Sequence, residues 1–252
     1  MFTTVGWANL MDPNGDFTPC LAIPDQHVRT ELNSIFIQEF NLLLGGMALI
    51  GAAAGQARFV APSLRRVNPQ AIEPLETAIV QAGVPIHAVS PRTGIQLDQN
   101  EQLQFESNPT LAGAQEQAGY AWLADARITP VEGQIRTIRF VIATVVNSVI
   151  HGWVNAELDF IDDLPIGVYD IVGAGLFGAS IRCYRFVPIG AHHRPGGPGA
   201  ATNEQGLTHA FRYGDMGVWL TFETVRPPSI DVSTSAVVAL ANTEGFIDVI
   251  AR

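Results

Sequence analysis

The chain has 252 residues, of which 47% are hydrophobic and only 15% charged, and its formal net charge at pH 7 is −10. All 14 cations are arginine, because the chain contains no lysine. The absence of lysine excludes the phosphate-binding lysine of a P-loop, Schiff-base catalysis and a pyridoxal-phosphate anchor. No run of three basic residues occurs, so the basic stripe that direct nucleic-acid binding needs is also missing.

Turn-forming residues dominate the start of the chain. The segment 11–16 (MDPNGD) is dense in them, so we expect residues 1–30 to form an N-terminal arm. Residues 31–50 alternate partly, which favours a strand and leaves a helix open. The apolar run 42–55 has about 14 residues, is broken by glycines and is shorter than the ~20 that a bilayer span needs. We expect it to be a buried strand pair or a packed helix.

One helix is predicted, over residues 72–82, where Pro74 is placed as a helix starter and Gly83 follows the end. From Gly94 onward the pattern is that of short strands. Apolar and polar residues alternate, β-branched residues are frequent, and Pro/Gly clusters separate the segments. The clearest of these segments are 102–105, 120–123, 134–146, 151–161, 168–172, 179–187, 217–225 and 237–250.

Short strands with turn signals at intervals of ~8–12 residues are typical of a β-sandwich or jelly roll. We therefore predict an all-β fold of antiparallel jelly-roll sandwiches, two in tandem, with few short helices. The expected domains are an arm at 1–30, a first sandwich at 31–130, and a second sandwich with the C-terminal segment at 131–252. The boundary is placed near Gly133, after Pro130.

Histidine and acidic residues give two candidate metal sites. His192 and His193, with Glu204, His151 and His209, could form a cupin-type cluster. Adjacent histidines on a strand point to opposite faces, however, and these two lie in a Pro/Gly-rich stretch, so a solvated or intersubunit loop is preferred. The acidic residues Asp159, Asp162 and Asp163 could bind calcium between subunits, but a solvated acidic turn is the simpler interpretation.

Other chemistry-bearing residues lack the partners that catalysis needs. Cys20 and Cys183 fit no metal spacing and are expected to be reduced or buried thiols. No serine lies in a nucleophile-elbow motif, and no catalytic triad can be assigned. The four tryptophans are dispersed, which favours core or subunit contacts over a sugar-stacking platform; they are Trp7, Trp122, Trp153 and Trp219.

Candidate subunit contacts are the pair Arg65 and Arg66 and the loop 190–206. The arginine pair could meet a phosphate or a lipid headgroup, but an ion pair with an acidic neighbour is the simpler role. The loop carries His193 and Arg194 beside several prolines, which reduce the entropy lost when a loop is ordered. Arginine can also bind a neighbour's carboxylate through two hydrogen bonds. We therefore expect these four residues to contact other subunits.

Five segments between Gly94 and Ala236 carry a resemblance to a known family: 100–105 (NEQLQF), 122–125 (WLAD), 164–173 (LPIGVYDIVG), 194–196 (RPG) and 211–214 (FRYG) before Trp219. An upstream segment, 61–66 (APSLRR), extends it. On these segments, the stretch from Gly94 to Ala236 resembles the jelly-roll coat proteins of tailless icosahedral viruses, including the double jelly-roll lineage. The resemblance is one of overall pattern rather than of a diagnostic motif, and it covers about three-fifths of the chain.

The resemblance implies two packed antiparallel sheets, subunit contacts through loops and termini, and no enzymatic activity or cofactor. It implies a structural virion protein, the major capsid protein, that assembles with copies of itself into a trimer or a larger shell. Other virion proteins are expected partners. The basic arm common in small RNA-virus coats is missing, which favours a shell separated from the genome by another layer, including an internal membrane. Such a protein is made in the host cytoplasm and located in the virion.

Two other functions stay open at this point. A carbohydrate- or ligand-binding β-sandwich module would expose a row of aromatic side chains. A cupin-like metalloenzyme would hold a stoichiometric metal ion. No secretory signal is expected, because the first ten residues lack a basic start and an apolar core, and the chain is predicted to be soluble.

Overall fold

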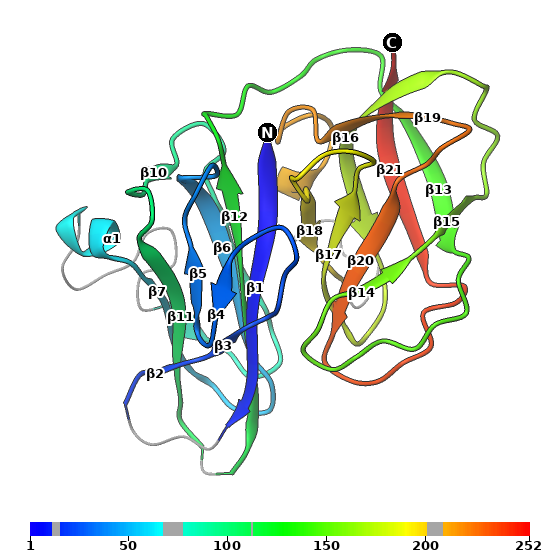
Figure 1. Cartoon of the computed structure of the whole chain (residues 1–252). Helices are drawn as coiled ribbons and strands as arrows, with labels where there is room; N and C mark the ends of the chain where they lie inside the picture. Colours follow the sequence, from blue (N-terminus) through cyan, green and yellow to red (C-terminus); the bar gives the residue numbers. More distant parts are fainter. Residues whose placement is uncertain (12–15, 68–77, 112, 201–208) are drawn as a thin grey trace. The chain divides into compact units, whose positions relative to one another are not determined.

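The structure of the chain is a computed structural model that describes residues 1–11, 16–67, 78–111, 113–200 and 209–252 (Figure 1). The described residues form mostly β-strands, with one short α-helix, α1 (Pro62–Val67), and one 3-10 helix, η1 (His209–Phe211). Every strand pairing whose register is described is antiparallel. The predicted all-β, antiparallel sandwich class is confirmed.

The chain divides into two compact units. The N-terminal unit comprises Val5–Arg127, and the C-terminal unit comprises Ile128–Arg252 together with Met1–Thr4. The division therefore falls close to the boundary expected at 130/131. The first four residues, however, belong to the unit formed by the other end of the chain.

The N-terminal unit contains two sheets. One has the order β10–β6–β12–β1, with β3 beside β1 and β9 also paired with β6; the other has the order β5–β11–β7–β8, with β4 beside β5 and β2 paired with β11. The strands are β1 (Phe2–Met11), β2 (Thr18–Pro19), β3 (Leu21–Ala22), β4 (Thr30–Glu31), β5 (Ser34–Phe36), β6 (Leu42–Ile50), β7 (Gly55–Val60), β8 (Ala78–Val80), β9 (Ile86–Val89), β10 (Ile95–Gln96), β11 (Gln102–Pro109) and β12 (Gln115–Ala124).

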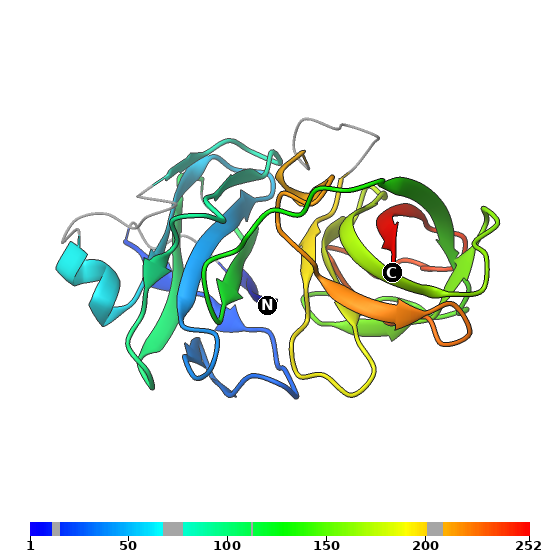
Figure 2. The same cartoon turned by 90° about the horizontal axis from the view of Figure 1, so that it is seen from above.

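The C-terminal unit also contains two sheets, which face each other across its core (Figure 2). One has the order β19–β16–β21–β13, with β15 beside β13, and the other has the order β14–β20–β17–β18. The strands are β13 (Arg136–Ile142), β14 (Val154–Ala156), β15 (Leu158–Phe160), β16 (Val168–Leu176), β17 (Ile181–Val187), β18 (Gly196–Pro198), β19 (Leu220–Glu223), β20 (Ser229–Thr234) and β21 (Glu244–Ala251).

The two units share one strand order. Each has eight main strands, which are β1, β5, β6, β7, β8, β10, β11 and β12 in one unit and β13, β14, β16, β17, β18, β19, β20 and β21 in the other. Numbered in chain order, the strands run 6-3-8-1 in one sheet and 2-7-4-5 in the other, and both units follow this order. An eight-stranded sandwich in which strands alternate between sheets in this way is consistent with a jelly roll.

Aromatic rings fill the space between the sheets of each unit. In the N-terminal unit, Trp7 of one sheet lies edge-on to Phe59 of the other, with ring centroids 5.7 Å apart, and Phe59 contacts Phe105 at 5.3 Å. In the C-terminal unit, Phe186 packs against Trp219 at 6.1 Å. All five side chains are fully buried. Burial of such large rings is the main stabilising contribution in each sandwich.

Residues 1–30 are not an irregular arm. Phe2–Met11 forms β1, and its first seven residues are buried. The turn-forming cluster 11–16 comes next in the sequence, and its residues 12–15 lie outside the described residues. The short strands β2, β3 and β4 account for further parts of the expected arm.

Two other local predictions differ from the structure. Of the helix expected at 72–82, residues 72–77 lie outside the described residues, while Ala78–Val80 forms β8 and pairs with β7. Pairing with a neighbouring strand outweighs the weak helical pattern there. The expected loop 190–206 contains β18, which pairs with β17 through its backbone.

Candidate functional site

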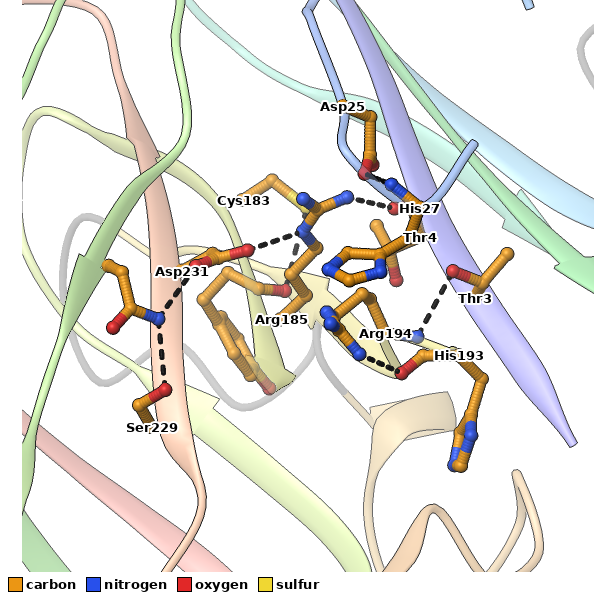
Figure 3. A network of polar contacts seen from close by, with 12 residues as sticks. Thr3, Thr4, Asp25, His27, Cys183, Arg185, His193, Arg194, Ser229 and Asp231 are labelled. Atoms are coloured by element: carbon orange, nitrogen blue, oxygen red, sulfur yellow. Dashed lines mark hydrogen bonds and ion pairs between the residues drawn. The ribbon is translucent and has the colours of Figure 1, made fainter. Parts of the chain in front are cut away.

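A polar cluster with a buried ion pair at its centre lies on one sheet of the C-terminal unit (Figure 3). Arg185 on β17 pairs in register with Asp231 on β20, which in turn pairs with Asn155 on β14. The Arg185 Nε donates to Asp231 Oδ2 at 3.0 Å, and Asn155 Nδ2 donates to Asp231 Oδ1 at 2.9 Å. Asn155 Nδ2 also donates to Ser229 Oγ at 2.9 Å. Directly opposite residues of adjacent strands lie on the same face, which explains why three distant segments meet here.

The same arginine binds the N-terminal segment of the chain. Arg185 Nη1 donates to the carbonyl oxygen of Thr4 at 3.1 Å. The Thr4 N–H donates to the carbonyl of Arg194 at 2.8 Å, and the Arg194 N–H donates to Thr3 Oγ1 at 3.1 Å (Figure 3). Thr3 and Thr4 are completely buried. These hydrogen bonds make the first residues of the chain a structural part of the C-terminal unit.

His193 and Arg194, predicted as subunit contacts on an exposed loop, are buried inside this unit. A ring nitrogen of His193, Nε2, is 3.0 Å from the carbonyl oxygen of Trp219. The Arg194 Nη1 donates to the carbonyls of Ala191 and His193 at 2.8 and 2.9 Å. A subunit contact would require these two side chains to be exposed. In the structure they are buried, and they contact backbone carbonyl groups of the same unit. A role in contacts with another subunit does not follow from this placement.

The other predicted contact residues, Arg65 and Arg66, lie in α1. Their side chains fall outside the described part of the structure, as do the side chain of His209 and residues 201–208, which include Glu204. The role predicted for Arg65 and Arg66 at subunit contacts therefore stays a prediction.

A second buried ion pair lies on the outer face of the other sheet of the C-terminal unit. Arg212 donates from Nε and Nη2 to the two carboxylate oxygens of Asp248, at 2.6 and 3.0 Å. The carboxylate also accepts from Thr137 Oγ1 at 2.7 Å and from the Tyr213 N–H at 3.2 Å. The guanidinium lies 3.9 Å from the centroid of the Phe246 ring. Four hydrogen bonds satisfy the completely buried carboxylate, as a buried charge requires.

Two glycines of β16 make room for this arrangement. A Cβ atom on Gly173 would lie 2.7 Å from Asp248 Oδ2 and 2.9 Å from the Cα of Arg212. A Cβ atom on Gly175 would lie 2.5 Å from the ring of Phe246. The sequence Gly-Ala-Gly in this strand therefore leaves a hollow on the outer face of the sheet, and the ion pair and the aromatic ring occupy it.

A cavity of about 600 Å³ opens beside this ion pair, lined among others by Arg139, Arg212, Tyr213, Glu244 and Phe246. A smaller one of about 290 Å³ lies along β19, beside Ile189 and Pro228. In the larger cavity Arg139 donates from Nη2 to Asp162 Oδ1 at 2.8 Å. Its hydrogen bonds and charge hold the pKa of the Asp162 carboxyl below its usual range. The larger cavity thus combines aromatic rings with charged groups that are mostly paired.

The candidate metal residues that the structure describes do not come together. The Asp162 carboxylate accepts hydrogen bonds from the guanidinium and the backbone N–H of Arg139. It does not form a shared calcium site with Asp159 and Asp163. His193 is buried against Trp219, whereas His192 is exposed. Within the described ranges, no group of three or more histidine, cysteine or acidic residues is placed to hold a metal ion.

Both cysteines are free thiols, and both are buried. Burial raises the pKa of Cys20 to about 12, an effect that its contact with Ser107 only partly offsets. Burial likewise raises the pKa of the Cys183 thiol. Since the thiolate is the reactive form, neither residue is a candidate nucleophile.

We expect both thiols to resist alkylation in the native protein. At pH 8, where an exposed cysteine is partly ionised, iodoacetamide should label fewer than about 0.1 thiols per chain within an hour, because both groups are protonated and inaccessible. In urea the same reagent should label both cysteines of the chain. Mass spectrometry of the intact protein measures both results. Fast labelling of either cysteine without denaturant would contradict its buried position.

Within the part of the chain that the structure describes, no helix is both long and apolar enough to cross a lipid bilayer. No protein-family model matches the chain, and no curated protein matches it. Among solved structures, the chain is similar to the crystal structure of the major capsid protein P2 from bacteriophage PM2. The identity is 10%, the match covers 100% of this chain and 97% of that chain, and the TM-score is 0.23. A TM-score this low carries no argument about fold or function.

Proposed function

We propose that the chain is a tandem jelly-roll protein and serves as the major capsid protein of a virus, with its copies assembling into an icosahedral shell. The observation that carries the proposal is the repeated strand order, 6-3-8-1 and 2-7-4-5, in both units of one chain. Viral capsid proteins are one of the main groups built from jelly rolls. The protein would be made in the host cytoplasm and located in the virion, with copies of itself and other virion proteins as partners.

The packed interior of each unit supports this proposal. Jelly rolls also occur in lectins and cupins, so the fold alone does not choose among these functions. In this chain the space between the sheets is occupied by rings that are less than 2% exposed; they include Trp7, Phe59 and Phe105 in one unit and Phe140, Tyr184, Phe186 and Trp219 in the other. Because side chains fill the space between the sheets, we infer that the protein acts through its outer surface, as a shell subunit does.

The distribution of arginine supports the expectation that the genome is not bound directly. Three of the 14 cations, Arg185, Arg194 and Arg212, are buried within the C-terminal unit. At most 11 cations (14 minus 3) are left for the surface, against at most 20 acidic residues (24 minus the buried Glu106, Asp170, Asp231 and Asp248). Neutralising phosphates requires clustered exposed cations, and this balance works against it.

The proposal predicts that the purified full-length chain forms oligomers. We expect sedimentation velocity to show species at multiples of 27.1 kDa, and negative-stain microscopy to show rings or shells as protein or salt concentration rises. Added salt should favour assembly because it screens the repulsion between chains of net charge −10. A monomer at all concentrations and salt conditions would overturn the proposed function.

A second candidate function, a carbohydrate- or ligand-binding module, is favoured by one observation. Tyr213 borders the larger cavity and is the one exposed aromatic side chain among the described residues. Its backbone lies in the left-handed region, with a φ of 53°, which is uncommon for a residue other than glycine. Binding on a glycan array that is lost in Tyr213→Ala would support this function, and an array without signal would remove it.

A further inference from the structure

Two loops of the C-terminal unit lie at the same end of the sandwich (Figure 1). They are residues 143–153, between β13 and β14, and residues 235–243, between β20 and β21. The N–H of Ser148 donates to the carbonyl of Val238 at 2.8 Å, and the N–H of Val238 donates to Ser148 Oγ at 2.9 Å. The N–H of Leu240 donates to the carbonyl of Val146 at 2.9 Å. Because these bonds join the loops around the buried Ser148, the loops form a single platform.

This platform presents four branched apolar side chains to solvent. The exposed fractions are 90% for Val145, 58% for Val149, 46% for Ile150 and 60% for Val237. Scattered exposed apolar residues are ordinary, but a group of four on two joined loops marks an interaction site. We refer to these four residues as the loop-end patch.

The two loops that carry the patch contain no charged residue. Residues 140–156 and 232–243 contain no aspartate, glutamate, arginine or lysine. In contrast, the loops between β15 and β16 and between β19 and β20 carry Asp162, Asp163 and Arg226. Two copies of a chain with net charge −10 repel each other over most of their surface. An uncharged apolar patch is the surface on which two such copies can meet without opposing like charges.

We propose that the loop-end patch is a contact between copies of this chain in the assembled shell, an inference that rests on the proposed function. A lipid surface is the less favoured occupant. Membrane-binding surfaces commonly combine Trp or Phe with arginine or lysine, and none of these is among the four residues of the patch. Trp153, on the first of the two loops, instead has its ring under the guanidinium of Arg185, with the guanidinium carbon 4.2 Å from the ring centroid.

The size of the patch indicates what kind of contact it makes. A stable binary interface uses about 20–30 residues on each side, many more than these four. One such contact is therefore weak, and many of them become strong only when several form together within a closed assembly. This behaviour suits a subunit that must remain soluble before it assembles.

The test compares two double variants of the full-length chain that add the same charge. One is Val145→Glu with Val237→Glu in the patch, and the control is Ile166→Glu with Val225→Glu, at two exposed positions in other loops of the same unit. We expect the patch variant to need about tenfold or more protein for half-assembly than wild type, since buried like charges oppose each other across the contact. We expect the control to assemble within about twofold of wild type. Sedimentation velocity gives these concentrations, and thermal unfolding checks that both variants remain folded.

The outcomes separate this inference from the proposed function. If wild type assembles and the patch variant assembles equally well, or if the control loses assembly to the same extent, the patch is not the contact while the shell function stands. If wild type never assembles, the proposed function fails first and the inference falls with it. If the glutamate variant unfolds, the test uses Val145→Thr with Val237→Thr instead. Threonine keeps the shape of valine but is more polar, so this variant should still need more protein than wild type for half-assembly. Flotation of wild type with neutral phosphatidylcholine vesicles would assign the patch to lipid and overturn the inference.

Discussion

Replacing Asp248 with asparagine is expected to lower the free energy of unfolding of the C-terminal unit by about 3–5 kcal/mol. The substitution keeps the size of the side chain but removes the charge that Arg212 meets through two hydrogen bonds, at 2.6 and 3.0 Å. Asp248 is completely buried and Arg212 nearly so, so the remaining guanidinium cannot be solvated. Urea unfolding followed by tryptophan fluorescence measures the change.

Two matched variants show whether the unpaired charge is the cause. Arg212→Met combined with Asp248→Leu removes both charges and should recover much of the lost stability, because an apolar pair of similar volume often replaces a buried ion pair without loss. Arg139→Ala breaks the exposed pair with Asp162 in the same unit and should leave the unfolding midpoint nearly unchanged. An Asp248→Asn variant as stable as wild type would contradict the role assigned to the ion pair.

Replacing Phe2 with alanine is expected to destabilise the C-terminal unit by about 3–5 kcal/mol, although Phe2 lies at the opposite end of the sequence. Its ring is fully buried and lies edge-on to Trp219, with centroids 5.4 Å apart. Truncation leaves a cavity beside Trp219 and weakens the anchoring of Thr3 and Thr4, which bind Arg194. Urea unfolding followed by tryptophan fluorescence reports the effect.

Leu10→Ala is the matched control for this prediction. Leu10 lies on the same strand as Phe2 but is exposed, so its truncation should change the free energy of unfolding by no more than about 0.5 kcal/mol. If Phe2→Ala were equally mild, the first residues would not be a structural part of the C-terminal unit, and their assignment to it would be wrong.

Strands could be predicted from the sequence where the segment itself has alternating apolar residues or many β-branched residues. The segments 134–146, 179–187 and 217–225 contain β13, β17 and β19, and the apolar run 42–55 contains β6. Local prediction failed where a distant partner decided the conformation. β18 is mainly glycine and proline and is a strand only because it pairs with β17. β1 looked like part of an arm because the turn cluster that follows it was the stronger local signal.

The contact residues show the same limit. The sequence showed that Arg194 lies near prolines and glycines, which suggested an exposed loop, but the buried residues Thr3 and Thr4 cover that segment from 190 positions away. The charge-free stretches 140–156 and 232–243 could have been noticed in the sequence. That they form one surface follows only from the hydrogen bonds of Ser148 to Val238, on loops that are 90 residues apart.

The sequence by itself determined the all-β class, the acidic and lysine-free composition and the chemistry that these exclude. It did so because alternation, β-branching and charge are properties of short segments or of the whole composition. The tertiary structure alone decided the strand order of the two sandwiches, the pairing of Arg185 with Asp231 and of Arg212 with Asp248, and the membership of Met1–Thr4 in the C-terminal unit. The two ion pairs and the hydrogen bond of Arg194 to Thr3 join residues that are 36 or more positions apart. Such contacts form only when sheet pairing and core packing bring distant segments together, and local preferences do not encode which segments those are.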